Sequence, residues 1–313
     1  MLTVTLNPSI DRTVALSSLT VGAINRAEGI TLDPGGKGVN VSRAAHAYGA
    51  KTHAVFVAGR LGGSWMSDEL QNSQIPHTLI TSGAAVRSNM TIVEENGTVT
   101  KINEPGSALS AADLAKVKDA LATLDLENSW VLLAGRLNPG LAASTYSELA
   151  TFVKSRGARV AVDTSGEELA AAVKAQVVDL IKPNHHELSE LVGRPLRTIQ
   201  EIIDASHEVI RGGVHTILCS MGADGALLIT ENSATHCEPI TKVSGTPVGA
   251  GDILLSIFIS AGCDERALEE AVQWSAASVP LPGTSIPSPA QAAAIEVSSR
   301  TDFDRSRVLV EGE

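Results

Sequence analysis

Short apolar runs alternate with longer segments of helical periodicity through the middle of this chain, and this alternation constrains the fold more than any other feature. Three successive pairs show it: residues 131–133 with 141–154, 160–162 with 167–174, and 179–181 with 185–192. A helical segment at 199–210 and an apolar run at 216–219 continue the pattern, and Ser110 begins an earlier helix with a capping sequence. Such units connect parallel strands through helices. We therefore predict an α/β fold with a mostly parallel sheet covered by helices on both faces.

Two stretches, residues 12–32 and 88–103, interrupt the alternation and have the character of β-strands outside the main sheet. The second contains Asn96-Gly97, which favours a tight hairpin turn. A chain of 313 residues with 43% hydrophobic content can bury the core of one large domain, and no interdomain linker is visible. We expect a single domain over residues 1–313, with a small β-sheet lid formed by about 12–32 and 88–103.

Several features of the sequence limit where the protein is located in the cell and which partners it binds. A net charge of −11 argues against nucleic acid as the main partner. Met1 leads directly into a strand-like segment, and no stretch reaches the roughly 18 apolar residues of a membrane helix. We expect a cytoplasmic protein without a membrane partner. The cysteines lack disulfide or metal spacing and are expected to be buried, reduced thiols: Cys219, Cys237 and Cys263.

A glycine turn near the end of the chain, Gly249-Ala250-Gly251, places Asp252 at the start of an apolar segment with the length of a buried helix. Glycines allow backbone N–H groups to converge, and a helix N-terminus carries about half a positive charge, so the turn suits an anion such as a transferring phosphoryl group. Asp252 is then a candidate proton acceptor. A glycine turn that only starts a core helix explains this motif equally well when it is taken alone.

Two motifs in the first 40 residues offer groups for a polar ligand. Asp11 follows the first apolar run and could accept hydrogen bonds from sugar hydroxyls, or simply cap a turn. Gly35 and Gly36 form a second glycine turn before a helix, and Asn40 offers an amide on that helix. The spacing is neither that of a Walker A loop nor that of a Rossmann fingerprint.

Two later motifs suit a nucleotide and its metal ion. Asn184 and Glu187 lie one helical turn apart, where they could order water around Mg²⁺ or serve as a helix cap and a solvated side chain. The segment from Ser220 through Gly222 to Gly225 could cover a nucleotide or form an ordinary hairpin.

In this order and spacing, the motifs resemble those of the ribokinase-like, or phosphofructokinase B, sugar kinase family across nearly the whole chain. The similarity is greatest to its hexose-phosphate branch, the 1-phosphofructokinases and tagatose-6-phosphate kinases, through residues 6–11, 35–41, 87–89 and 162–166. The resemblance implies an ATP- and Mg²⁺-dependent kinase that phosphorylates a hexose phosphate, with fructose 1-phosphate as the favoured acceptor and fructose 1,6-bisphosphate as product. It also implies a lid that closes over the sugar and a homodimer formed through the lid.

The resemblance assigns roles residue by residue. The residue matching Asp252 is the general base, and the backbone matching Gly249, Ala250 and Gly251 is the anion hole. The sugar-binding positions are matched by Asp11, Gly35, Gly36 and Asn40. The position that binds the sugar's own phosphate is matched by Arg87. Residues that match the ATP site are Ser220, Gly222 and Gly225, with Lys182 close by, and those that match the positions ordering Mg²⁺ are Asn184 and Glu187.

The chain departs from the family pattern near the site. Pro247 replaces a usual Thr, and Ile253 replaces a usual small residue after the base. Arg136 replaces a serine close to the acceptor's phosphate. We expect Arg136 to form a second phosphate clamp beside Arg87, the alternative being an outward-pointing surface pair, and Arg26 in the lid is a further candidate for a phosphate contact.

These departures leave other functions open. The acceptor could be tagatose 6-phosphate, fructose 6-phosphate, an unphosphorylated sugar or a nucleoside. A third interpretation is a catalytically weak sugar-phosphate sensor, and the joint presence of Asp252, Asn184 and Glu187 argues against it.

Overall fold

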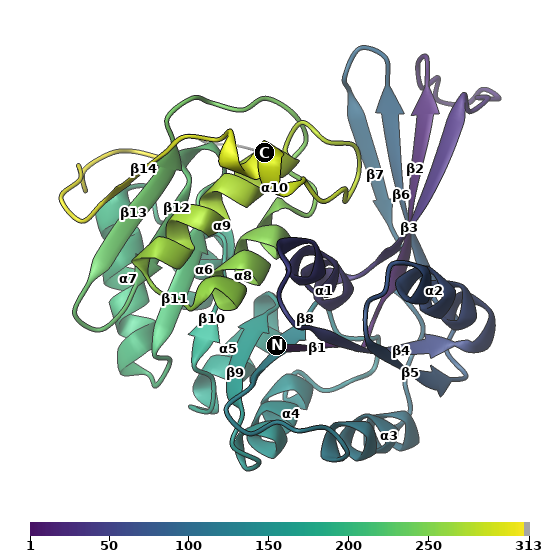
Figure 1. The fold of residues 1–313 in the computed structure, drawn as a ribbon, viewed down its shortest axis with the longest axis horizontal. Helices are drawn as coiled ribbons and strands as arrows, with labels where there is room; N and C mark the ends of the chain where they lie inside the picture. The colour runs from purple at the N-terminus through teal and green to yellow at the C-terminus, as the bar shows by residue number, and fades with distance from the viewer. Residues whose placement is uncertain (310–313) are drawn as a thin grey trace.

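The computed structural model describes residues 1–309 and shows a ten-stranded sheet between two layers of helices (Figure 1). Seven neighbouring strands are parallel, in this order across the sheet: β11 (Thr216–Ser220), β10 (Leu180–Ile181), β9 (Arg159–Asp163), β8 (Trp130–Ala134), β1 (Leu2–Thr5), β4 (His53–Gly59) and β5 (His77–Ser82). Beyond β11 the sheet continues with three antiparallel strands: β12 (Ala226–Ile229), β13 (Ala234–Pro239) and β14 (Val297–Arg300). The predicted mostly parallel α/β sheet is confirmed.

Helices cover both faces of this sheet (Figure 1). On one face lie α1 (Lys37–Tyr48), α2 (Arg60–Asn72), α8 (Ala250–Ala261) and α9 (Glu265–Ser278), and the short α10 (Pro289–Ala293) packs beside α9. On the other lie α3 (Ala111–Ala122), α4 (Thr145–Lys154), α5 (Gly166–Lys174), α6 (His185–Val192) and α7 (Ile199–Arg211).

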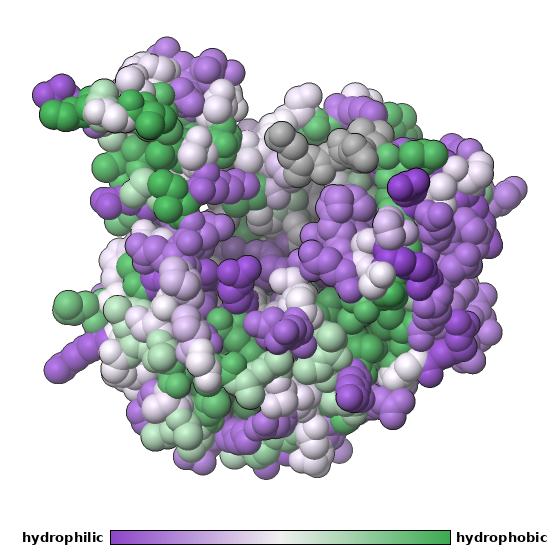
Figure 2. Space-filling model, turned by 180° about the vertical axis from the view of Figure 1, so that it is seen from behind, coloured by the Kyte–Doolittle hydropathy of each residue, from purple (hydrophilic) through white to green (hydrophobic). Residues whose placement is uncertain are grey.

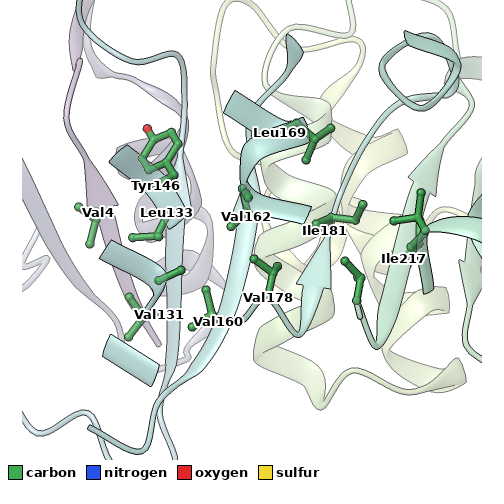
Figure 3. Close-up of a cluster of buried hydrophobic side chains, with 14 of the residues drawn as sticks. Val4, Val131, Leu133, Tyr146, Val160, Val162, Leu169, Val178, Ile181 and Ile217 are labelled. Carbon is green, nitrogen blue, oxygen red and sulfur yellow. The ribbon is translucent and has the colours of Figure 1, made fainter. Parts of the chain in front are cut away.

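Side-chain alternation along the central strands explains the two layers. Val131 and Leu133 of β8 belong to the cluster under α3 to α7, which Figure 3 shows in part, whereas Leu132 and Ala134 pack against α8. Successive side chains of a strand point to opposite faces, so a strand buried on both faces is apolar throughout. The apolar sequence of β8 therefore agrees with its place between β9 and β1 in the interior of the sheet.

The helix and strand ranges predicted from local patterns are close to those observed. Ser110 caps α3 through a capping box with Asp113. The helix predicted from residue 141 begins later, at Thr145, because the residues before it form a turn in which the Thr145 N–H donates to the Ala142 carbonyl at 2.9 Å. Cys219 and Cys237 are buried free thiols, but burial was wrongly predicted for Cys263, which is partly exposed because it lies in the turn that ends α8.

A second sheet of four strands, the lid, projects from one end of the molecule (Figure 1). It consists, in spatial order, of β3 (Gly29–Gly35), β2 (Ser9–Leu16), β6 (Arg87–Glu94) and β7 (Val99–Asn103). The two predicted stretches lie in the strands of this second sheet, which extends further, to Ser9 and Gly35. Figure 2 shows a hollow between the lid and the main body, lined mainly by hydrophilic side chains. Because β2 and β6 directly follow the carboxyl ends of β1 and β5, the lid stands at that edge of the main sheet.

Within residues 1–309, none of the helices combines the length and apolar character needed to cross a membrane.

Candidate active site

Three parallel strands deliver polar residues to one edge of the main sheet. Asp163 is the last residue of β9, Lys182 follows β10 directly, and Ser220 ends β11. Ligands of α/β sheets bind beyond the carboxyl ends of the strands. A cavity of about 630 Å³ lies there, within the range of about 300–1,000 Å³ typical of small-molecule sites. Its walls bring together most of the predicted site residues: Lys182, Asn184, Glu187, Ser220, Gly222, Gly225, Gly249, Ala250, Gly251 and Asp252.

The glycine turn forms the N-terminus of α8. Gly249 is the N-cap with a φ of 76°, a left-handed conformation that glycine adopts without strain. The N–H groups of Gly251 and Asp252 have no acceptor among the described residues, as expected for the first turn of a helix. A side-chain carbon at Gly251 would lie 3.3 Å from Lys182 Nζ. Free N–H groups, the helix N-terminus and an ammonium group therefore converge on a position suited to an anion.

Asp252 lies on the first turn of α8 and is buried. Burial, followed by repulsion from Asp163, raises the pKa of Asp252 to about 6, and Lys37 and a hydrogen bond from Asn40 limit the rise. A carboxyl group with this pKa is ionised at neutral pH but still accepts a proton readily. This combination suits a general base.

Lys37 and Asp163 are charged residues beside Asp252 that the sequence analysis did not single out. Lys37 Nζ donates a hydrogen bond of 2.7 Å to Asp163 Oδ1, and Lys182 Nζ lies 3.6 Å from Asp163 Oδ2. Burial alone would lower the pKa of Lys37, but the charge of Asp163, with those of Asp252 and Glu187, raises it overall. The fully buried Asp163 carboxylate thus holds two ammonium groups at the edge of the cavity.

The predicted sugar-binding residues gather on the lid side of Asp252. Asp11 on β2 accepts hydrogen bonds from the Ser9 hydroxyl at 2.7 Å and the Asn89 amide at 3.0 Å. Burial raises the pKa of Asp11, and these two hydrogen bonds oppose the rise. A side-chain carbon at Gly35 would lie 2.2 Å from Asp11 Oδ2, so glycine is required for this approach.

Gly36 and Asn40 connect this cluster to the base. Gly36 is the N-cap of α1 with a φ of 102°, and a side-chain carbon there would lie 3.0 Å from the backbone of Pro8. Asn40, on the first turn of α1, donates from Nδ2 to Asp252 Oδ2 at 2.9 Å. Its Oδ1 is buried and has no partner among the described residues, so it can accept a hydrogen bond from a ligand.

Arg87 and Arg136 form a positive pair at the base of the lid. Arg87 starts β6 and donates from Nη1 to the Glu104 carbonyl at 3.2 Å, whereas its buried Nε has no partner among the described residues. Burial lowers the pKa of Arg87, Asp11 opposes this, and the charge of Arg136 lowers the pKa further. The exposed Arg136 has no carboxylate partner within residues 1–309, which disfavours the surface-pair alternative. Two neighbouring guanidinium groups suit a phosphate.

The predicted metal residues form a helix cap. Asn184 precedes α6 as its N-cap, in agreement with the helix-cap interpretation, and its Oδ1 accepts a 2.8 Å hydrogen bond from the Glu187 N–H. The Asn184 N–H in turn donates to Glu187 Oε2 at 2.9 Å. Glu187 Oε1 has no partner among the described residues and the side chain lines the cavity, so a carboxylate oxygen is available there. Mg²⁺ is commonly held by one or two carboxylates, water and phosphate oxygens, and this residue fits such a site.

The segment after β11 was described from the sequence either as a hairpin or as a cover for a nucleotide, and its position is compatible with both. A short 3-10 helix, Gly222–Asp224, links the antiparallel strands β11 and β12, so the segment is a hairpin connection. Ser220, Gly222 and Gly225 also line the cavity. Arg26, by contrast, lies in the exposed β2–β3 loop, and its side chain forms no hydrogen bond or ion pair with another candidate residue within residues 1–309.

Known proteins are similar to this chain in sequence and in fold. The pfkB family carbohydrate kinase model matches residues 4–290. The chain is 35% identical over 283 residues to 1-phosphofructokinase from Xanthomonas campestris pv. campestris, with 88% of each chain covered. It is 33% identical over 270 residues to 1-phosphofructokinase from Bacillus subtilis, covering 86% of this chain and 88% of that one.

A solved structure gives the same result for the fold. Phosphofructokinase-2 from Escherichia coli in complex with fructose-6-phosphate is similar with a TM-score of 0.86 and 26% identity, covering 94% of this chain and 97% of that one. The chain therefore belongs to the pfkB family of carbohydrate kinases.

Proposed function

We propose that this chain is an ATP-dependent hexose-phosphate kinase that converts fructose 1-phosphate to fructose 1,6-bisphosphate. One observation carries the proposal: Asp252 is hydrogen-bonded to Asn40 on the sugar side and belongs to the same helix turn as the Gly249–Gly251 backbone. The base, the acceptor site and the anion hole therefore meet at one point. The two relatives named 1-phosphofructokinase support the choice of acceptor.

In the proposed reaction, Asp252 accepts the proton of the carbon-6 hydroxyl as that oxygen forms its bond to the γ-phosphorus. The bond from phosphorus to the bridging oxygen breaks, and ADP leaves. The N–H groups of Gly251 and Asp252, with Lys182, stabilise the negative charge on the transferred group. ATP supplies the phosphoryl group. Glu187 and Asn184 would hold the water shell of Mg²⁺, which would neutralise charge on the ATP phosphates. Ser220, Gly222 and Gly225 form the wall that holds the nucleotide.

The acceptor is held from the lid side. Asp11 and Asn40, with the Gly35–Gly36 backbone, bind the sugar hydroxyls, and Arg87 with Arg136 binds the 1-phosphate. Charge-assisted, bidentate hydrogen bonds of arginine are well matched to a phosphate group. Closure of the lid over the sugar excludes water from the transferred phosphoryl group and thereby limits ATP hydrolysis.

We propose further that the chain is one ribokinase-like domain with its lid, and that two copies associate through the lid. Val21, Ile24 and Ile30 of the lid are 92%, 84% and 53% exposed, and Figure 2 shows hydrophobic side chains over this projecting part. An exposed apolar surface of this kind favours association. Light scattering should give the mass of a dimer, and replacing Val21 and Ile24 by lysine should give that of a monomer.

An ADP-release assay over a panel of acceptors tests the proposed function. The panel contains fructose 1-phosphate, fructose 6-phosphate, tagatose 6-phosphate, fructose and a nucleoside. We expect kcat/KM to be highest for fructose 1-phosphate. A higher value for another acceptor would reassign the substrate. If no acceptor in the panel causes release of ADP, the sugar-phosphate sensor is favoured.

A further inference from the structure

Arg43 on α1 connects the lid to a loop that supports the glycine turn. Its side chain is only 16% exposed. Nη2 contacts Asp33 Oδ1 on β3 at 3.1 Å, and Nη1 donates to the Thr284 hydroxyl at 3.2 Å and to the Pro34 carbonyl at 3.4 Å. One guanidinium group therefore joins a lid strand, a helix of the main body and the loop between α9 and α10.

The lid partner of Arg43 lies beside the sugar cluster. Asp33 is paired with Asp11 in the register of β2 and β3, so the two residues are direct neighbours across the lid strands. Burial raises the pKa of Asp11, and the charge of Arg43 is one of the influences that oppose this rise. Arg43 thus acts on the acceptor side both through Asp33 and through its own charge.

The loop partner of Arg43 lies against the turn. Thr284 is 7% exposed, and a side-chain carbon at Gly249 would lie 3.6–3.7 Å from three Thr284 atoms, which is van der Waals distance. The preceding residue, Gly283, approaches the lid directly, since a side-chain carbon there would lie 3.1 Å from the Thr13 hydroxyl of β2. The loop therefore packs between the lid and the N-cap of α8.

We propose that Arg43 is a positioning residue that couples the lid strands β2 and β3 to the Gly249–Gly251 turn through Thr284. The turn then adopts the geometry for phosphoryl transfer when the lid strands hold the acceptor, which links sugar binding to phosphoryl transfer. This inference rests on the proposed function. Arginine suits the role because its planar fork carries several fixed donors and binds two partners simultaneously, whereas the single ammonium group of lysine does not reproduce that geometry.

Steady-state kinetics of four variants test the coupling: Arg43→Gln, Arg43→Lys, Thr284→Val and the double variant Arg43→Gln/Thr284→Val. Displacement of the turn should lower kcat about 10- to 100-fold in Arg43→Gln, while KM for ATP changes less than about twofold. Thr284→Val should act in the same direction. The double variant should be no slower than Arg43→Gln, because the Thr284 substitution breaks the Arg43–Thr284 hydrogen bond that Arg43→Gln has already removed. ADP released per sugar phosphorylated should rise. The exposed Arg211→Gln on α7 controls for loss of an arginine and should match the wild type.

Hydrogen exchange gives a readout that does not depend on turnover. In Arg43→Gln, the amides of residues 29–35 and 249–254 should both exchange faster than in the wild type, and neither segment should change in Arg211→Gln. An unchanged kcat with a lower Tm, multiplicative effects in the double variant, or faster exchange in residues 29–35 alone would each overturn the coupling. If the wild type phosphorylates no acceptor, the proposed function fails and hydrogen exchange alone decides the coupling. If Arg43→Gln does not fold, Arg43→Lys and Thr284→Val provide the same comparisons.

Discussion

The Asn40 side chain donates a hydrogen bond of 2.9 Å to the Asp252 carboxylate, joining two positions that are 212 residues apart. The bond leaves one carboxylate oxygen of Asp252 for other partners and fixes the direction in which that oxygen points. The orientation of the proposed base therefore depends on α1 as much as on α8, the helix that carries it.

Replacing Asp252 by Asn should lower kcat by about 10² to 10⁴, the usual contribution of a general base. Folding and ATP binding should be retained, because the two side chains have the same shape. Stopped-time ADP assays give kcat, and calorimetry gives the affinity for ATP. Near-normal turnover would remove Asp252 from the mechanism and leave its motif as a helix start.

The activity should fall in mild acid. Burial and the charge of Asp163 raise the pKa of Asp252 to about 6, so the ionised form that accepts a proton is lost as the pH drops through this value. We expect kcat/KM to decrease about tenfold for each unit of pH well below the pKa. A profile measured between pH 5 and 8 should bend near pH 6, and the residual activity of Asp252→Asn should not show this bend. A flat wild-type profile would contradict the assignment of Asp252 as the titrating base.

Removing the Arg87 guanidinium should weaken binding of the sugar phosphate and leave ATP almost unaffected. Arg87→Ala loses a partly buried charged hydrogen bond, which contributes about 1.5–3 kcal/mol. This corresponds to a rise in KM of roughly 10- to 150-fold. Fructose without its phosphate is the matched control acceptor. If the variant loses as much activity with fructose as with fructose 1-phosphate, Arg87 does not recognise the phosphate.

Arg136 should act on the same phosphate from the loop after β8. Replacing it by Ser should raise KM for the sugar phosphate several-fold by removing one arm of the proposed clamp. Tm and KM for ATP should stay constant, because the side chain is exposed and lies outside the nucleotide cavity. An unchanged KM for the sugar phosphate would leave Arg136 as a surface substitution.

Local elements of this fold could be predicted because their signals are local. The predicted and observed bounds of α6 agree, since Asn184 caps its start and Gly193, with a φ of 69°, ends it. Apart from the hairpin considered at residues 220–225, the antiparallel strands β12, β13 and β14 gave no comparable signal, because the direction of a strand depends on the neighbour that it meets in space. In the lid, the hairpin turn predicted at Asn96-Gly97 is confirmed by the antiparallel pairing of β6 with β7, but the pairing of β2 with β6 joins distant segments and was not predicted.

From the residues alone, a part of the site could be predicted only where its functional groups lie together in one short motif. The Gly249–Asp252 turn is of this kind. The contact between Lys37 and Asp163 joins residues 126 positions apart, and neither residue alone differs from an ordinary surface lysine or strand-end aspartate. Their partnership requires α1 and the carboxyl end of β9 to meet, which depends on packing of the whole sheet.

The parallel pairing of β2 with β6, from Ser9 opposite Arg87 to Leu16 opposite Glu94, has a consequence for how the lid is built and exchanged. The lid consists of two hairpins, β2–β3 and β6–β7, and the segment between them contributes α1, α2, β4 and β5 to the main body. Each hairpin can form locally, but their union closes a long loop and therefore follows assembly of the body. An exchange of lids between relatives must accordingly transfer both hairpins at once, because the seam between β2 and β6 is where two separately encoded halves have to match.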